Sequence, residues 1–454
     1  MRVTEVPGHH PPHRRATASR TARARVPRRL AGAAAGVVLA SSLAACGSGD
    51  GGGTPTLTWY TNPDAGGQAE IASRCTDAAG GKYRITPAVL PRDAAGQREQ
   101  LIRRLAAEDS SIDIMSLDPI FVPEFAQAGF LAPVPEDLAD QVTEGVVPPS
   151  VESSTWNDEL VAVPFWANTQ VLWYRKSVAE AAGLDMSQPV TWDQLIQAAQ
   201  DQDVLIGAQG ARAESLTVWV NALIESAGGH IIEENADDPE DITLGLDSEA
   251  GRRAVEVMRA VADSGQVSAA FSTENEDASA TGFESDRGGF QVNYPFVYAR
   301  GLGAVEAGSL DQSVVDDYAA AVYPRVDEDT PAAPPFGGIN LGIGAYSEHT
   351  DLAYDAAACI VSEENQAYYF VHDGNPASKA SVFDDPEVLE EFPQAPVIRE
   401  SLELAAPRPQ TPYYSEVSGG IQREYHPPAS VDPETTPKSA TEFITAVLAG
   451  DQLL

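Results

Sequence analysis

Residues 56–64, TLTWYTNPD, begin the pattern that decides the fold. The first six residues alternate and are rich in β-formers, Asn62-Pro63-Asp64 is typical of a turn, and residues 67–79 have helical character. The same order continues with a strand, an amphipathic helix and a third strand at residues 82–90, 96–107 and 111–117. Strands and helices that alternate at this length predict an α/β lobe with a largely parallel sheet.

Three polar residues follow strands of this predicted sheet. In open α/β sheets, ligands bind beyond the carboxyl ends of the strands, and Asn62, Asp64 and Asp118 occupy such positions. Asn and Asp are also favoured helix caps and turn formers, so capping is the alternative interpretation. For Asp118, which precedes Pro119, both interpretations stay open.

The amino-terminal region is typical of an exported lipoprotein. An arginine-rich leader precedes the weakly apolar run 30–45, which is shorter than the about 20 residues that a transmembrane helix needs. The run ends in Leu43-Ala44-Ala45-Cys46, which resembles the lipobox of bacterial lipoproteins. We therefore expect a signal peptide at 1–45, lipidation of Cys46, a flexible tether at 46–55 and anchoring at the extracytoplasmic face of the cell membrane. A chance cysteine at position 46 is the alternative.

The charge balance excludes nucleic acid as a partner. Removing the leader, with its eight arginines and one glutamate, takes the formal net charge from −38 to −45. Such an excess of acid solvates a surface and repels phosphates, while a hydrophobic content of 43% is too high for a disordered chain. About 400 residues exceed what one hydrophobic core supports, so two lobes are expected.

Two cysteines remain once Cys46 is assigned to lipid. Cys75 and Cys359 are expected to pair, because the protein is exported; two buried thiols are the alternative. The histidines that follow the leader are scattered, and neither zinc-ligand spacing nor a nucleophile motif is present. The sequence thus predicts no cofactor, no metal site and no enzyme.

Aromatic residues concentrate in residues 162–184. We assign Trp173 and Tyr174 to core packing, whereas Trp166 and Asn168 lie at a turn and are candidates for display to a ligand. Near the end of the chain, Arg408 and two tyrosines lie on a proline-rich loop, which holds polar side-chain tips in place. An ordinary solvated arginine is the alternative there.

The order of these blocks resembles the family 1 extracytoplasmic solute-binding proteins of ABC importers, and most of all the trehalose-binding lipoproteins of mycobacterial-type importers. The matching blocks are TLTWYT, SIDIMSLD, VPFWANTQVLWYRKS, TWDQL, GGFQVNYPF, GGINLGIGAYS and RPQTPYYSEVS. The resemblance implies a two-lobe, type II periplasmic-binding-protein-like α/β fold with a ligand cleft between the lobes. Lobe one would comprise 56–164 plus 300–370, and lobe two 165–299 plus 371–454. This division places Cys75 and Cys359 in one lobe, which strengthens the expected pairing.

Hydroxyl groups of a sugar can be held by carboxylates and amides, and its apolar face by an aromatic ring. The candidate ligand-binding residues are Asn62, Asp64, Gln97, Asp118, Trp166, Asn168, Glu276, Tyr294, Gly338, Ile339 and Arg408. Glu276, Gly338, Ile339 and Arg408 join the set through the resemblance alone. Glu274 is close enough to compete with Glu276, and relatives often have tryptophan where this chain has Tyr294.

The resemblance implies a monomeric binder that captures a disaccharide, with trehalose favoured, by hinge closure and delivers it to an ABC permease with ATPase subunits. Alternatives are another α-glycoside, a glycerophosphodiester held by Arg408, or an exported glycosidase, which requires two flanking carboxylates. Alanine at Asp118 or Arg408 is expected to abolish sugar binding and to leave thermal unfolding of the free protein nearly unchanged.

Overall fold

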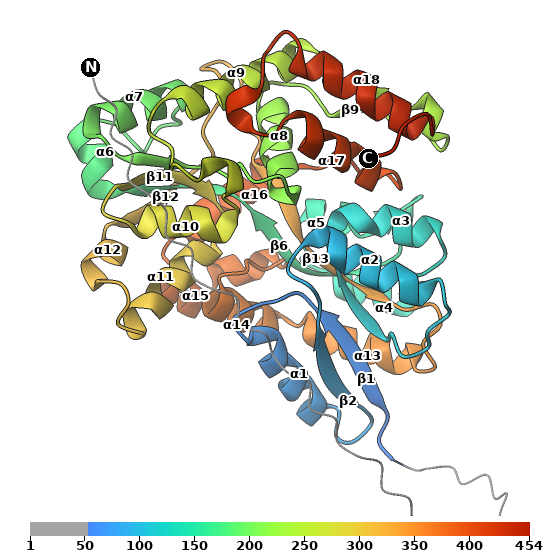
Figure 1. Cartoon of the computed structure of the whole chain (residues 1–454). Coiled ribbons are helices and arrows are strands. Elements are labelled where there is room, and N and C mark those ends of the chain that lie inside the picture. Colours follow the sequence, from blue (N-terminus) through green and yellow to red (C-terminus); the bar gives the residue numbers. More distant parts are fainter. Residues whose placement is uncertain (1–52) are drawn as a thin grey trace, which may run out of the picture. The chain divides into compact units, whose positions relative to one another are not determined.

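The computed structural model describes residues 53–454 (Figure 1). The expected signal peptide, the lipidation site Cys46 and most of the tether lie outside the described residues. Two β-sheets organise this part of the chain, and we call the regions around them the first and second lobes. Among residues 53–454, no helix combines the length and the apolar character needed to cross a bilayer.

The first sheet has the order β14-β13-β3-β1-β2, and β6 pairs with β13. Its strands are β1 (Thr56–Thr61), β2 (Arg84–Val89), β3 (Ile114–Leu117), β6 (Val163–Thr169), β13 (Pro335–Ile343) and β14 (Ala406–Pro407). β1 is parallel to both β2 and β3, as expected, whereas β13 runs antiparallel to β3 and β6. The sheet is therefore mixed, with its parallel half supplied by the segment that the sequence pattern singled out.

The alternation in β1 decides which helices cover each face of this sheet. Leu57 and Trp59 point into one core, where they pack with residues of α1 (Gly67–Ala78) and α13 (Thr350–Ile360). Tyr60 belongs to a second core together with Leu101 of α2 (Ala94–Leu105). Successive side chains of a strand point to opposite faces, so α2 lies across the sheet from α1 and α13.

The second sheet has the order β12-β7-β11-β8. Its strands are β7 (Val171–Arg175), β8 (Leu205–Gly207), β11 (Gly288–Asn293) and β12 (Tyr318–Ala321). β7 is antiparallel to both of its neighbours, and β11 is parallel to β8. Trp173 is completely buried in β7, and Tyr174 packs against the main core of this lobe, so their assignment to the core is confirmed. Two small pairs complete the strands, β4 (Thr155–Trp156) with β5 (Glu159–Leu160) and β9 (Ile232–Glu234) with β10 (Thr243–Leu244).

Helices cover both sheets (Figure 1). The remaining α-helices are α3 (Val122–Gln127), α4 (Glu136–Thr143), α5 (Pro148–Glu152), α6 (Lys176–Ala182), α7 (Trp192–Gln202), α8 (Glu214–Ser226), α9 (Glu249–Asp263), α10 (Glu276–Glu284), α11 (Phe296–Glu306), α12 (Gln312–Asp316), α14 (Glu363–Asp373), α15 (Pro386–Glu391), α16 (Ala395–Leu404), α17 (Tyr414–Glu424) and α18 (Thr436–Leu448). Residues 351–370 have continuous helical character in the sequence. The structure has a break there, because Ser362 caps α14 by accepting a hydrogen bond from the Asn365 N–H.

Strand pairing differs from the expected lobe boundaries in two places. β12 was expected in lobe one with 300–370, but it pairs with β7 in the second sheet. β6 and β14 were assigned largely to lobe two, but both pair with β13 in the first sheet. Chain order does not reveal which sheet a short strand joins; pairing of backbone groups does. The other boundaries stay a prediction.

Cys75 and Cys359 form the disulfide that was expected from export and from the lobe assignment, with a Cα–Cα distance of 5.8 Å. It joins α1 to α13 across 284 residues of chain. Asn365 donates hydrogen bonds to the Cys75 Sγ and to the Cys359 carbonyl, at 3.5 and 2.9 Å. The bridge therefore belongs to the helical layer on one face of the first sheet.

Candidate functional site

A cavity of about 860 Å³ has walls from both lobes. This volume lies in the range of small-molecule sites. In the first lobe, its walls come from the loops after β1, β2 and β3; in the second, from the starts of α8 and α10 and the end of β11. All eleven candidate ligand-binding residues line this one cavity. The structure brings them together from positions as far apart as Asn62 and Arg408; their contact with a ligand stays a prediction.

An amide pair at the cavity wall joins the loop after β1 to the first turn of α2. The Asn62 Nδ2 donates to the Gln97 Oε1 at 3.1 Å, and the Gln97 Nε2 donates to the Pro91 carbonyl at 2.9 Å. Within the described part of the chain, the buried Asn62 Oδ1 has no hydrogen-bond partner. Since a buried polar oxygen without a partner is unfavourable, this atom can gain free energy from a ligand hydroxyl.

Asp64 stabilises the turn that leads into α1, as in its alternative interpretation as a turn former, while it also lines the cavity; the N-cap of the helix itself is Gly66. Its carboxylate accepts hydrogen bonds from the Gly66 and Gln68 N–H groups at 3.0 and 2.8 Å, and from the Tyr369 hydroxyl at 3.3 Å. The carboxylate thus holds the entrance to α1 in place. A ligand hydroxyl that bonds Asp64 would share a carboxylate oxygen that already accepts hydrogen bonds from the protein.

Trp166, Asn168, Gly338 and Ile339 form a continuous piece of the wall, because β6 and β13 pair there. Ile339 lies opposite Trp166, and the register shifts immediately after it. The half-buried indole of Trp166 packs edge to face against Tyr369 with 6.1 Å between ring centroids. Its Nε1 has no partner among residues 53–454, so it is a second group that a ligand could satisfy.

Gly338 is required by the backbone at this point. Its φ is +124°, and a Cβ would lie 2.1 Å from the Trp166 carbonyl oxygen. We expect Gly338→Ala to lower the free energy of unfolding by at least about 2 kcal/mol and to weaken ligand binding by displacing Trp166. Urea unfolding and calorimetric titration of the variant test this. The control is Gly282→Ala in α10, where a Cβ meets no atom within 4 Å and the residue does not line the cavity; equal stability of the two variants would contradict the expectation.

Arg408 is a buried ion-pair partner and not a solvated surface arginine. It is 4% exposed, and its guanidinium donates to the Asp118 carboxylate at 2.6 Å and to the Glu214 carboxylate at 2.8 Å. Asp118 follows β3 of the first sheet, where it also accepts a hydrogen bond from the Ile120 N–H at 3.3 Å. It therefore caps the turn that begins at Pro119 and also forms the ion pair with Arg408. Glu214 begins α8 of the second lobe. One arginine therefore joins the two lobes at the cavity.

Glu214 is a site residue that the sequence analysis missed. Besides Arg408, it accepts hydrogen bonds from the Tyr414 hydroxyl and, at 2.7 Å, from the Ser418 hydroxyl. Burial raises the pKa of Glu214, and the positive charge of Arg408 opposes that rise. A usable signal was present: Glu214 precedes the apolar run LTVWV, and α8 is buried along most of its length. An acid at the start of such a helix must find partners.

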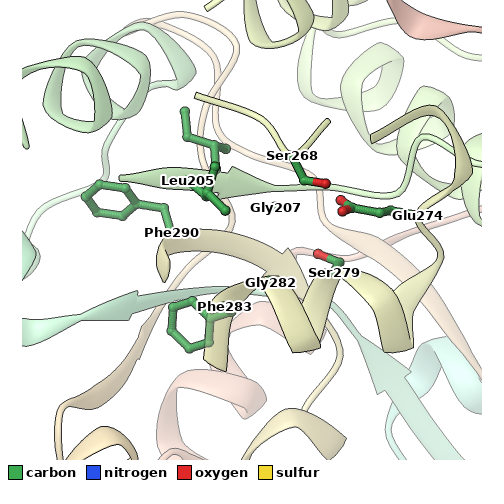
Figure 2. Close-up of a pocket in the computed structure, with 9 residues that line it drawn as sticks. Leu205, Gly207, Ser268, Glu274, Ser279, Gly282, Phe283 and Phe290 are labelled. Atoms are coloured by element: carbon green, nitrogen blue, oxygen red, sulfur yellow. The ribbon is translucent and has the colours of Figure 1, made fainter. Parts of the chain in front are cut away.

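Glu276, and not Glu274, reaches the large cavity. Glu274 lines a separate void of about 10 Å³ behind α10, where its carboxylate lies near Ser268 and Ser279 (Figure 2). That void is the size of a single water and is too small for a sugar. Burial raises the pKa of Glu276, and it also raises the pKa of Tyr294 on the same wall.

Further wall residues were not predicted. Arg92 of the first lobe and Asp277 of the second form an exposed ion pair at 3.0 Å, which contributes little free energy. The wall also includes Asp93, Ser215, Val218, Asn275, Phe296, Arg300, Tyr369, His372, Asp373 and Asn375. In the described residues, no cluster of three or more potential metal ligands exists.

Residues 84–367 match the model of the bacterial extracellular solute-binding protein family. The chain belongs to this family. A probable ABC transporter-binding protein of Deinococcus radiodurans is 24% identical over 336 residues, which are 71% of this chain and 75% of that protein. Membership makes this chain a solute binder and not an enzyme.

Solved structures of similar shape support the two-lobe fold. A T. maritima protein, MalE3, solved with maltose, is 24% identical with a TM-score of 0.74; the similarity covers 87% of this chain and 99% of that one. A solute-binding protein from Thermotoga lettingae, bound to α-D-tagatose, is 23% identical with a TM-score of 0.71. The similarity covers 87% of this chain and 100% of that one. The predicted type of fold is confirmed.

Proposed function

We propose that this protein captures a neutral sugar in the cavity between its lobes and delivers it to the permease of an ABC importer. The observation that carries the proposal is the arrangement at Arg408, where carboxylates from both lobes meet at one cavity lined by further amide, carboxylate and aromatic groups. A sugar that contacts both walls stabilises the arrangement in which the lobes are close, so binding favours closure.

A neutral ligand fits the charges of the wall better than a phosphodiester. Each arginine of the cavity already has a carboxylate partner: Arg92 pairs with Asp277, Arg300 with Glu284, and Arg408 as described above. Other acids of the wall add negative charge, which repels an anion. The glycerophosphodiester interpretation therefore loses its main support, which was a free Arg408.

Trehalose is our preferred sugar, because the sequence blocks that line the cavity resemble those of trehalose-binding lipoproteins. The maltose of the T. maritima neighbour and the tagatose of the T. lettingae neighbour agree with a sugar ligand in general. We further propose a lipid anchor at Cys46, a monomer, and docking on a permease that has ATPase subunits. Anchoring near the permease raises the effective concentration for delivery.

A thermal-shift screen tests this proposal. At a concentration of about 100 times its dissociation constant, a ligand adds roughly 2.7 kcal/mol to the free energy of unfolding, which gives a clear rise in Tm. We expect the largest rise with trehalose, a smaller one with maltose or mannitol, and none with a glycerophosphodiester. A Tm that no sugar raises would refute the proposal. Product analysis after incubation separates binding from hydrolysis, because a binder returns the disaccharide intact.

A further inference from the structure

A group of buried polar side chains lies behind the second-lobe wall of the cavity. Ser279, Gln291 and Asn293 are at most 1% exposed, and none of them lines the cavity. Burying polar side chains is unfavourable unless each is hydrogen-bonded, and an apolar core would be the simpler way to fill this space. We call these three residues the amide network.

Asn293 connects the amide network to two residues of the cavity wall. Its Nδ2 donates to the Glu276 carbonyl at 3.0 Å and to the Gln291 Oε1 at 3.1 Å, and its Oδ1 accepts from the Tyr294 N–H at 2.9 Å. Both donors and the acceptor of this amide are used. One side chain thus ties the start of α10, where Glu276 lies, to the end of β11, where Tyr294 follows.

The other contacts of the network limit movement of this connection. The Ser279 hydroxyl donates to the same Gln291 Oε1 at 3.2 Å, which links α10 to β11 a second time. The Trp173 Nε1 donates to the Tyr294 carbonyl at 3.2 Å, so the backbone of Tyr294 is held on both sides. Hydrogen bonds between completely buried groups are stronger than those in water, so these contacts restrain the connection, although the Gln291 Nε2 has no partner among the described residues.

We propose that Asn293 is a positioning residue of the sugar site. It sets the spacing between the Glu276 carboxylate and the Tyr294 ring, although it does not touch the ligand itself. The inference rests on the proposed function, because the spacing matters only if a sugar contacts both residues. A binding site whose supporting contacts are loosened loses affinity even when every ligand-contacting side chain is present.

Asn293→Ala is the first test. We expect its affinity for the sugar that best stabilises the unsubstituted protein to fall roughly tenfold or more, in line with lost buried hydrogen bonds. The matched control is Ser226→Ala. Ser226 is equally buried in the second lobe, its hydroxyl bonds the Ala333 N–H at 2.9 Å, and it does not line the cavity. The control should lose stability but keep its affinity. If Asn293→Ala does not fold, Asn293→Ser replaces it, because the shorter serine side chain cannot make the three hydrogen bonds of the Asn293 amide.

A double-mutant cycle with Glu276→Gln separates positioning from general damage. If Asn293 acts through Glu276, the affinity lost in the double variant is smaller than the product of the two single fold-losses. The inference would be overturned if Asn293→Ala left the affinity unchanged, or if the fold-loss of affinity in the double variant equalled the product of the two single fold-losses. The proposed function would stand in either case. Absence of sugar binding in the unsubstituted protein would overturn both.

Discussion

Arg408→Ala is expected to abolish sugar binding and to lower the free energy of unfolding by about 3 to 5 kcal/mol. The loss of stability follows from burial: Arg408 is 4% exposed and faces the carboxylates of Asp118 and Glu214. Without the guanidinium, two negative groups remain close together with no cation between them. The loss of binding follows because both lobes lose their shared contact at the cavity.

This expectation differs from the one drawn from sequence alone, in which unfolding of the free protein stays nearly unchanged. A proline-rich loop indicates a surface position, and nothing in the local sequence shows that Arg408 reaches across 290 residues to Asp118. The correction is thus a consequence of the tertiary contacts.

The pH dependence of this variant gives a second readout. Burial raises the pKa of Glu214, and Arg408 opposes the rise, so removal of Arg408 raises that pKa further. A carboxyl whose folded pKa lies above its unfolded value stabilises the fold below the unfolded pKa, and this stability is lost as pH rises through the folded pKa. The free energy of unfolding that Arg408→Ala loses, relative to the unsubstituted protein, should therefore be smaller at pH 5 than at pH 7.

Calorimetric titration with sugar and urea unfolding measure the two effects. Arg175→Ala is the matched control, since Arg175 is a buried arginine of the second lobe that donates to the Val314 and Phe283 carbonyls and does not line the cavity. It should lose stability and keep its affinity. An Arg408→Ala protein that binds sugar normally would refute the role of Arg408 in the site.

The local sequence pattern was sufficient to predict those elements whose structure depends on their own residues. The strand expected at 56–61 is β1 to the residue, because its alternation matches a sheet with a core on each face. The candidate residues after β1 and β3 line the cavity because the carboxyl ends of parallel strands meet at one edge.

The sequence pattern could not predict contacts between segments that are far apart in the chain. Glu214 was missed because its partners, Arg408, Tyr414 and Ser418, lie about 200 residues further along the chain. Read alone, it is an ordinary acidic residue in the first turn of a helix. The expected lobe one included residues 318–321, which form β12 and pair with β7 in the second sheet; four residues, YAAA, carry no information about their pairing partner.

Loss of the Cys75–Cys359 disulfide is expected to lower the free energy of unfolding by roughly 4 to 5 kcal/mol and to leave sugar affinity within about twofold. The size of the effect follows from the sequence separation of 284 between the cysteines, because closing a long loop removes much conformational freedom from the unfolded chain. Affinity is preserved because neither cysteine lines the cavity.

Urea unfolding of the same protein with and without reductant tests this, with Cys46 replaced in every sample so that only this pair responds. A Cys75→Ala, Cys359→Ala double variant controls for incomplete reduction, and it should unfold at the same urea concentration as the reduced protein. Equal midpoints for the oxidised and reduced forms would refute the expectation. If reduction also weakened sugar binding, the helical layer of α1 and α13 would have to move with the cavity wall. Asp64 would be the residue that transmits the change, because its carboxylate holds the loop into α1.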